Sequence, residues 1–157
     1  MFVARRDRIV RIEGDRVTTV TDAISDPSVI AIHGDDLFVA DDRAIWRVAT
    51  RGKRTPAKLA ELAGPPMFVA VDGATIYTQL FGGDDLLAIP TRGGDATVAI
   101  AHVGEVSSLV ASKGVLFWTS MPDALGVAAD ARSVYWFDWT LGGGPMQVMR
   151  APRPRAK

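Results

Sequence analysis

Two pairs of neighbouring aspartates are the residues of this chain best suited to chemistry. Asp41–Asp42 and Asp84–Asp85 each place two carboxylates side by side within a turn-rich segment. Carboxylate oxygens are the ligands that a hard cation such as Ca²⁺ prefers. Aspartates in turns also accept hydrogen bonds from their own backbone. Because neither pair has the ligand spacing of a calcium loop, turn capping is the favoured interpretation and Ca²⁺ binding is the alternative.

Three further residues complete the candidate site. Asp138 and Trp139 end the densest aromatic run of the chain. Asp41 and Asp138 end equivalent strands of the repeat described below, which favours a structural role at the corner between strand and loop. Trp139 lies at the loop, where an indole could stack on a sugar or on a peptide side chain. The candidate ligand-binding residues are therefore Asp41, Asp42, Arg43, Asp84, Asp85, Asp138 and Trp139.

No catalytic constellation is visible. The chain has no cysteine and only two histidines, His33 and His102. Neither histidine has a partner at metal-ligand spacing, and the Gly-x-Ser-x-Gly nucleophile motif is missing. We expect His33 at a hairpin turn away from the candidate loops, and His102 toward the outer edge of a sheet. The glycine pairs read as hairpin turns rather than phosphate cradles, since no helix follows them.

Composition narrows the class of protein. The chain has 157 residues, 48% of them apolar and 23% charged, which fits one soluble domain with a real core. Its 18 basic and 18 acidic residues cancel, so it lacks the basic footprint of a nucleic-acid binder. No apolar run approaches the roughly 18 residues of a membrane span. The first residues lack the apolar stretch of a signal peptide, so we expect none in this chain.

Internal repeats organise the sequence. Phe2–Ile12 matches Phe38–Val48 at six of eleven positions, with a constant offset of 36. An aromatic residue then recurs at Phe38, Tyr77 and Phe117, spaced 39 and 40 apart. A short apolar strand precedes each aromatic strand, at Val29–Ile32, Phe68–Val71 and Leu109–Ala111. Four short strands in about 40 residues are typical of a β-propeller blade, in which stacked sheets cover each other's apolar faces.

The repeat is incomplete in places. The chain begins at a second strand, and the third and fourth strands are missing after Phe117–Ser120. We therefore expect an all-β fold, an incomplete or open β-propeller of about four blades with up to four antiparallel strands each. Sixteen strands are expected, grouped as three, four, four, two and three. One domain spans 1–157, with blades at about 1–24, 25–63, 64–103, 104–120 (truncated) and 121–152, and a frayed tail at 153–157.

The second strands also carry a family resemblance. They read Phe38-Val-Ala-Asp41, Phe117-Trp-Thr-Ser120 and Tyr135-Trp-Phe-Asp138, and strands with an arginine and an Ala-Pro or Val-Ala ending follow. This pattern resembles the YWTD-type and NHL/TolB-like propeller repeats of bacterial exported proteins. The resemblance implies an exported or periplasmic parent protein. Such families include carbohydrate- and protein-binding domains, sensors, and a few lactonases and lyases. The Tyr-Trp-Thr-Asp string is never complete here, and the blade at 104–120 is truncated.

These observations favour a non-enzymatic recognition or scaffold module. We expect it to bind a protein, a peptide or a carbohydrate through its loop face, and open sheet edges could also support self-association. The alternative is a metal-dependent hydrolase or lyase with Asp41, Asp84 and Asp138 as ligands. A third interpretation is a fragment of a larger propeller protein without independent activity.

Overall fold

The computed structural model describes residues 1–52, 55–120, 124–129, 133–138 and 147–152, and these residues form sixteen strands. No described residue lies in a helix, and so none lies in a helix long and apolar enough to cross a membrane. The strands are β1 (Phe2–Arg5), β2 (Arg8–Glu13), β3 (Arg16–Thr21), β4 (Val29–His33), β5 (Asp36–Ala40), β6 (Ala44–Ala49), β7 (Ala57–Glu61), β8 (Ala70–Asp72), β9 (Thr75–Gln79), β10 (Leu86–Pro90), β11 (Thr97–Ile100), β12 (Val106–Ser112), β13 (Val115–Ser120), β14 (Ala124–Ala129), β15 (Ser133–Asp138) and β16 (Gln147–Pro152).

Five antiparallel sheets follow one another along the chain. They are β1–β3, β4–β7, β8–β11, β12–β13 and β14–β16, and within each sheet the strands lie in sequence order. This grouping of three, four, four, two and three strands is the one that the repeats predict. Strand β7 takes the place of the fourth strand in the second blade, as the repeat predicts.

One predicted strand is shorter than expected. In the third sheet β8 begins at Ala70, whereas the repeat predicts a strand from Phe68. The preceding stretch meets its neighbour through the isolated Pro66–Leu80 bridge, whose two backbone bonds run from Met67 N–H to the Gln79 carbonyl and from Phe81 N–H to the Pro65 carbonyl. Ladder pairing is missing between this bridge and Ala70, so the predicted strand is split rather than continuous.

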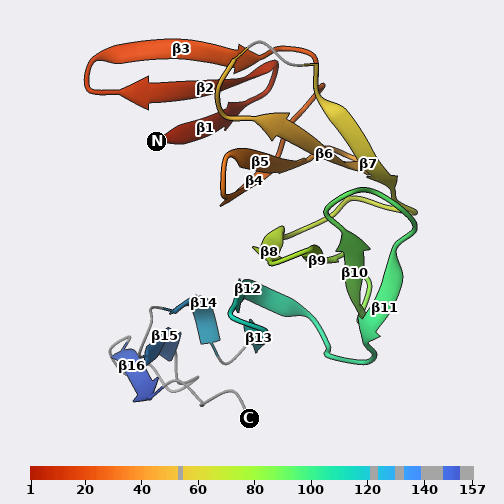
Figure 1. Ribbon diagram of the computed structural model, residues 1–157. Coiled ribbons are helices and arrows are strands. Elements are labelled where there is room, and N and C mark those ends of the chain that lie inside the picture. Colours follow the sequence, from red (N-terminus) through yellow and green to blue (C-terminus); the bar gives the residue numbers. More distant parts are fainter. Residues whose placement is uncertain (53–54, 121–123, 130–132, 139–146, 153–157) are drawn as a thin grey trace.

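The sheets are arranged as an arc (Figure 1). The first strand of each sheet lies against the first strand of the next, in the series β1, β4, β8, β12 and β14. Later strands of each sheet lie progressively farther from this inner line. This is the arrangement of propeller blades around an axis, here in an open or partial form.

Alternating side chains place the core between the sheets. In β5, Leu37 and Val39 pack toward the first sheet in a cluster with Ile9 and Ile24. The intervening residues, exemplified by Phe38, pack toward the third sheet. A further cluster joins the third and fourth sheets, formed by Ala70, Leu86, Val106 and Leu109. The alternation of a strand thus gives each sheet two apolar faces, and both are buried only because a sheet stacks on each side.

Candidate functional site

The candidate loops gather at one end of the sheets. Successive strands of an antiparallel sheet reverse direction, so connections from second to third strands and from fourth strands to the next sheet emerge at the same end. The former include the β5–β6 loop around Asp41 and the β9–β10 loop of residues 80–85. The latter include residues 22–28 and the β11–β12 loop of residues 101–105. We call this end the loop face.

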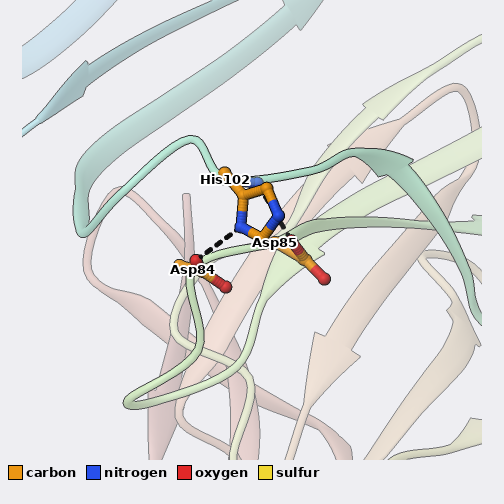
Figure 2. Close-up of side chains that lie close together, drawn as sticks. All are labelled: Asp84, Asp85 and His102. Atoms are coloured by element: carbon orange, nitrogen blue, oxygen red, sulfur yellow. Dashed lines mark hydrogen bonds and ion pairs between the residues drawn. The ribbon is translucent and has the colours of Figure 1, made fainter.

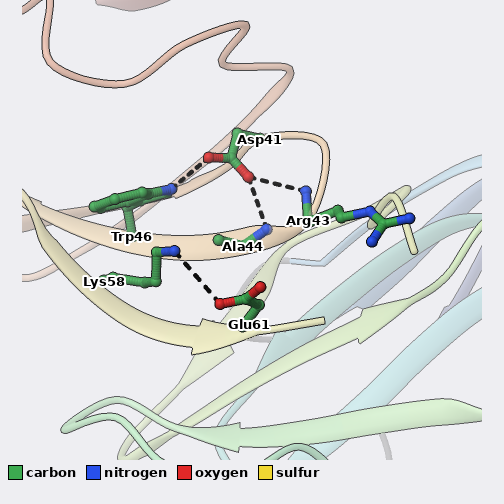
Figure 3. A network of polar contacts seen from close by, with 6 residues as sticks. All are labelled: Asp41, Arg43, Ala44, Trp46, Lys58 and Glu61. Atoms are coloured by element: carbon green, nitrogen blue, oxygen red, sulfur yellow. Dashed lines mark hydrogen bonds and ion pairs between the residues drawn. The ribbon is translucent and has the colours of Figure 1, made fainter. Parts of the chain in front are cut away.

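Asp41 closes the corner between β5 and β6 (Figure 3). Its Oδ1 accepts hydrogen bonds from the backbone N–H groups of Arg43 at 3.0 Å and Ala44 at 2.7 Å. Its Oδ2 accepts a bond of 2.6 Å from the Trp46 indole Nε1. Both carboxylate oxygens are therefore engaged in holding the turn, which is the structural role that the sequence favoured for this residue.

A polar hollow of about 250 Å³ surrounds this corner. Opposite charges meet along its β7 side, where Lys58 Nζ lies 3.6 Å from a Glu61 carboxylate oxygen. The same ammonium lies 5.3 Å from the centre of the Trp46 ring, within range of a cation–π contact. The hollow is lined by Ser25, Asp26, Asp41, Asp42, Arg43, Ala44, Lys58 and Glu61.

The second aspartate pair is joined by a histidine (Figure 2). His102 Nδ1 lies 2.9 Å from Asp84 Oδ2, and Asp85 Oδ1 accepts a bond of 3.0 Å from the His102 backbone N–H. His102 has a φ of 56°, a left-handed conformation that is uncommon outside glycine. One potential ligand atom from each of the three residues lies within 4.8 Å of the others. Among the described residues, this is the grouping that could hold a metal ion.

The His102–Asp84 pair shifts both pKa values toward the charged forms. The hydrogen bond to Asp84 raises the pKa of His102 above its ordinary 6.5, and the hydrogen bond to His102 lowers the pKa of Asp84 below its ordinary 3.8. The histidine contribution to stability is complete below pH 6.5 and is lost as pH rises through the raised pKa. The aspartate contribution is complete above pH 3.8 and is lost as pH falls through the lowered pKa. Both are therefore complete only between these two ordinary values.

Replacing Asp84 should release this shift. In the Asp84→Asn variant we expect the pKa of His102 to fall toward its ordinary value, because the carboxylate that stabilises the imidazolium is gone. NMR titration of the histidine ring resonances measures the pKa of His102. Both side chains are exposed, so added salt should reduce the shift in the wild-type chain. An unchanged His102 pKa in the variant would contradict the ion pair.

Gln79 ties the two halves of this loop region together. Its side chain is 1% exposed, and it donates from Nε2 to the Gly104 carbonyl at 2.7 Å. Its Oε1 accepts a bond of 2.9 Å from the backbone N–H of Val106. A backbone bond of 2.8 Å from Val103 N–H to the Asp84 carbonyl adds a second connection. The β11–β12 loop is thereby fixed against the β9–β10 loop.

Phe81 stands out from the same loop. Its side chain is 73% exposed, although its backbone N–H is bonded to the Pro65 carbonyl at 2.8 Å. The next turn is closed by a Gly83 N–H bond of 3.0 Å to the Leu80 carbonyl. A large aromatic ring is thus displayed to solvent on a backbone anchored on both sides.

The structure separates the predicted site residues into distinct groups. Asp41, Asp42 and Arg43 line the polar hollow, while Asp84 and Asp85 join His102. Asp138 ends β15, and its side chain lies outside the described part of the structure. Trp139 lies outside the described residues. Of the metal ligands in the alternative, Asp84 lies in the grouping with Asp85 and His102, while both carboxylate oxygens of Asp41 already accept hydrogen bonds within its own corner.

His102 follows β11, the outermost strand of its sheet, as the repeat predicts. The expectation that it has no partner at metal-ligand spacing was wrong, because its ring turns onto the loop face and lies 2.9 Å from Asp84. The available signal was its position two residues before Gly104, in the β11–β12 connection, which emerges at the same end as residues 80–85. The role of Gln79 could not be predicted from the sequence, because a glutamine inside a strand does not indicate which loop its side chain will contact.

A larger hollow contains none of the predicted residues. It has a volume of about 580 Å³ and lies between β7 and the β10–β11 region. Its lining is mostly aliphatic, and Gly94 N–H donates to the Leu59 carbonyl at 3.0 Å across this seam. Gly93, at φ 95°, approaches so closely that a Cβ would lie 3.1 Å from the same carbonyl oxygen. This hollow belongs to the packing between two blades.

Comparisons with known proteins identify the fold. No protein-family model matches the chain, and no curated protein matches it. The propeller in a nidogen/laminin complex is 16% identical, with a TM-score of 0.56 over 96% of this chain and 59% of that chain. The N-terminal domain of Nup159 is 11% identical, with a TM-score of 0.57 over 99% of this chain and 55% of that chain.

Both solved structures are β-propellers, and this chain spans rather more than half of each. At such low identity the likeness concerns the fold alone. The chain is therefore an incomplete or open β-propeller. This conclusion rests on the stacked sheets, on the inner line of first strands and on the likeness to the two solved structures.

Proposed function

We propose that this chain is a non-enzymatic recognition module that binds a protein partner through its loop face. The observation that carries the proposal is Phe81, a ring 73% exposed on an anchored loop. The same β9–β10 loop carries Asp84 and Asp85, which form a charged grouping with His102. An aromatic anchor with a polar rim is the usual composition of a binding hot spot. A preorganised loop also reduces the entropy lost on binding.

The comparisons support this proposal at a coarse level. One similar propeller was crystallised in a nidogen/laminin complex, that is, together with a protein partner. We also propose that the repeats are of the YWTD, NHL or TolB-like kind. A protein partner is the ligand proposed, and a peptide or a carbohydrate is the alternative that the experiment below distinguishes.

Selection followed by mutation tests the loop face. Peptides would be selected from a phage library against the immobilised full chain, and sugars would be screened on a glycan array. Selected ligands would then be titrated by calorimetry against the wild-type chain and the Phe81→Ser variant. We expect at least a tenfold rise in Kd for Phe81→Ser, about 1.4 kcal/mol or more, with the melting temperature unchanged.

Ile32→Ser is the matched control. Ile32 is 58% exposed, but it lies at the end of β4 that leads into the β4–β5 hairpin, opposite the loop face. Ligand affinity should survive this change. If the ligand affinity falls equally in both variants, or in neither, the loop-face proposal is refuted.

A metal-dependent hydrolase or lyase is the second candidate. The observation that favours it is the Asp84, Asp85 and His102 grouping. Two carboxylate oxygens and one imidazole nitrogen suit Zn²⁺ or Mn²⁺ better than Ca²⁺, which prefers oxygen alone. Coordination would have to replace the Asp84–His102 hydrogen bond and would require the neutral imidazole.

Calorimetry with Zn²⁺, Mn²⁺ and Ca²⁺ decides this candidate. If the metal binds, affinity should increase with pH through the His102 titration, and His102→Ala should weaken it at least tenfold. Asp42→Asn, at an exposed aspartate outside this grouping, should leave it unchanged. Absence of binding heat with all three ions would eliminate the metal-dependent enzyme.

A further inference from the structure

The two-stranded sheet lacks the strands that its neighbours have. In the four other sheets a third strand lies directly beside the second, but β13 pairs only with β12 among the described strands. The edge of β13 carries no charged residue and no proline, the two features by which edge strands normally discourage pairing. Beside the second strand of this sheet, no described strand occupies the place of a third strand, and we call this place the open edge.

Equivalent residues show what the missing strand would cover. Trp118 occupies the repeat position of Val39 in β5 and Thr78 in β9, counted from the recurring aromatic. Val39 and Thr78 are both 0% exposed, and each lies beside a third strand. Trp118 is 38% exposed. A large indole thus stays open to solvent at a position that is otherwise fully buried.

The backbone of β13 also faces this place. A two-residue turn with positive φ at Lys113 (52°) and Gly114 (74°) closes the β12–β13 hairpin after the Ser112–Val115 pair. In such a hairpin the closing pair is hydrogen-bonded, and pairs then alternate. The N–H and C=O groups of Leu116 and Trp118 consequently point away from β12, toward the open edge.

An apolar groove runs along the same strand. It has a volume of about 250 Å³ and is formed between β13 and the β14–β15 hairpin. Its lining residues are Leu116, Phe117, Trp118, Thr119, Val127, Val134 and Trp136. The open edge therefore offers both backbone hydrogen bonds and apolar pockets, which are the two requirements for recognition by strand addition.

The open place fits one strand and not a second copy of this chain. The flanking sheets β8–β11 and β14–β16 each continue to a third strand. Antiparallel pairing of two identical β13 strands would need a two-fold axis perpendicular to the sheet. Each copy would then bring its own flanking sheets onto faces that the other copy's flanking sheets occupy. A single extended segment brings no flanking sheets of its own, so it avoids this clash.

The chain itself shows the chemistry of a suitable strand. Opposite Leu37 and Ala40 of β5 lie Val48 and Ile45, which are 2% and 0% exposed. The equivalent residues of β9 are Ile76 and Gln79. Opposite them lie Ile89 and Leu86, which are also buried. In both sheets the third strand carries aliphatic residues three positions apart. The same spacing would face Leu116 and Thr119 of β13.

We propose that the β13 edge is a binding site for an extended segment of a partner protein, added antiparallel to β13, with aliphatic side chains three residues apart. The site lies along the sheet edge and goes beyond the proposed loop-face function. The two are separable, because ligands of the β13 edge should tolerate Phe81→Ser.

The probe is a synthetic peptide with the sequence of residues 42–50, which contains a natural third strand. We expect it to bind the full wild-type chain and to shift the amide resonances of Leu116 and Trp118 in NMR spectra. In an added strand, the peptide N–H groups point alternately toward β13 and away from it. N-methylation of the set that points toward β13 should weaken binding at least tenfold, and methylation of the other set should not. This arm uses the wild-type chain, so it stands even if a variant fails to fold.

Two variants at one position separate backbone from side-chain recognition. Trp118→Val and Trp118→Pro both remove the indole, but only proline removes the outward N–H, and proline is tolerated on edge strands. Peptide affinity should be at least tenfold weaker for Trp118→Pro than for Trp118→Val. Equal affinity for the two variants would overturn strand addition.

Three other results would overturn the proposal. They are the absence of peptide binding at millimolar concentration, amide shifts that map away from β13, and equal effects of the two N-methylated sets. Light scattering adds a fourth: a dimer of the wild-type chain that Trp118→Pro abolishes would assign the edge to a second copy.

Discussion

The Gln79→Met variant should lose about 2–3 kcal/mol of unfolding free energy, the cost of leaving a buried amide without its partner. Gln79 is 1% exposed and Val106, whose N–H it accepts, is also 1% exposed. Methionine conserves the volume, so the loss reports hydrogen bonding rather than a cavity. Urea denaturation followed by tryptophan fluorescence measures it. A variant as stable as the wild type would contradict the role of this side chain.

The Gln79→Glu variant serves as its control. Glutamate keeps an acceptor for Val106 N–H, but when ionised it cannot donate to the Gly104 carbonyl and it places a charge in a buried position. A protonated carboxyl restores the donor. Burial raises the pKa of such a carboxyl in the folded state, so the stability difference from wild type should shrink as pH falls through that raised pKa and be smallest below about 4.3, the ordinary glutamate pKa. A difference independent of pH would argue against a buried carboxyl at this position.

The Asp41→Ala variant should lose about 2–3 kcal/mol, because three donors lose a charged acceptor at once. Those donors are the backbone N–H groups of Arg43 and Ala44 and the indole of Trp46. Trp46→Phe removes only the third bond and should cost about 1 kcal/mol. Thermal and urea melts of the two variants give both values.

Its neighbour provides a matched control. Asp42 is exposed and also lines the polar hollow, yet no described hydrogen bond involves its side chain. Asp42→Ala should therefore stay within about 0.5 kcal/mol of the wild-type stability. Equal losses for Asp41→Ala and Asp42→Ala would mean that the corner bonds contribute little.

The sheets were predictable from local sequence patterns. Phe38, Tyr77 and Phe117 recur at a spacing set by four short strands and their turns, and each strand pairs with its sequence neighbour. Hairpin pairing is local, so alternation and turn residues specify it. The two-stranded sheet was predictable for the same reason, since the repeat simply omits two strands after Ser120.

Contacts between side chains of different sheets and loops depend on the tertiary structure and could not be predicted. Gln79 bonds Val106 across 27 positions, Asp84 meets His102 across 18, and Trp118 stays half-exposed beside an open edge. These outcomes depend on the stacking of one sheet on the next and on loop conformations such as the left-handed His102. Periodicity records which face a residue takes, but it contains no information about the loop conformations that bring distant polar groups within hydrogen-bond distance.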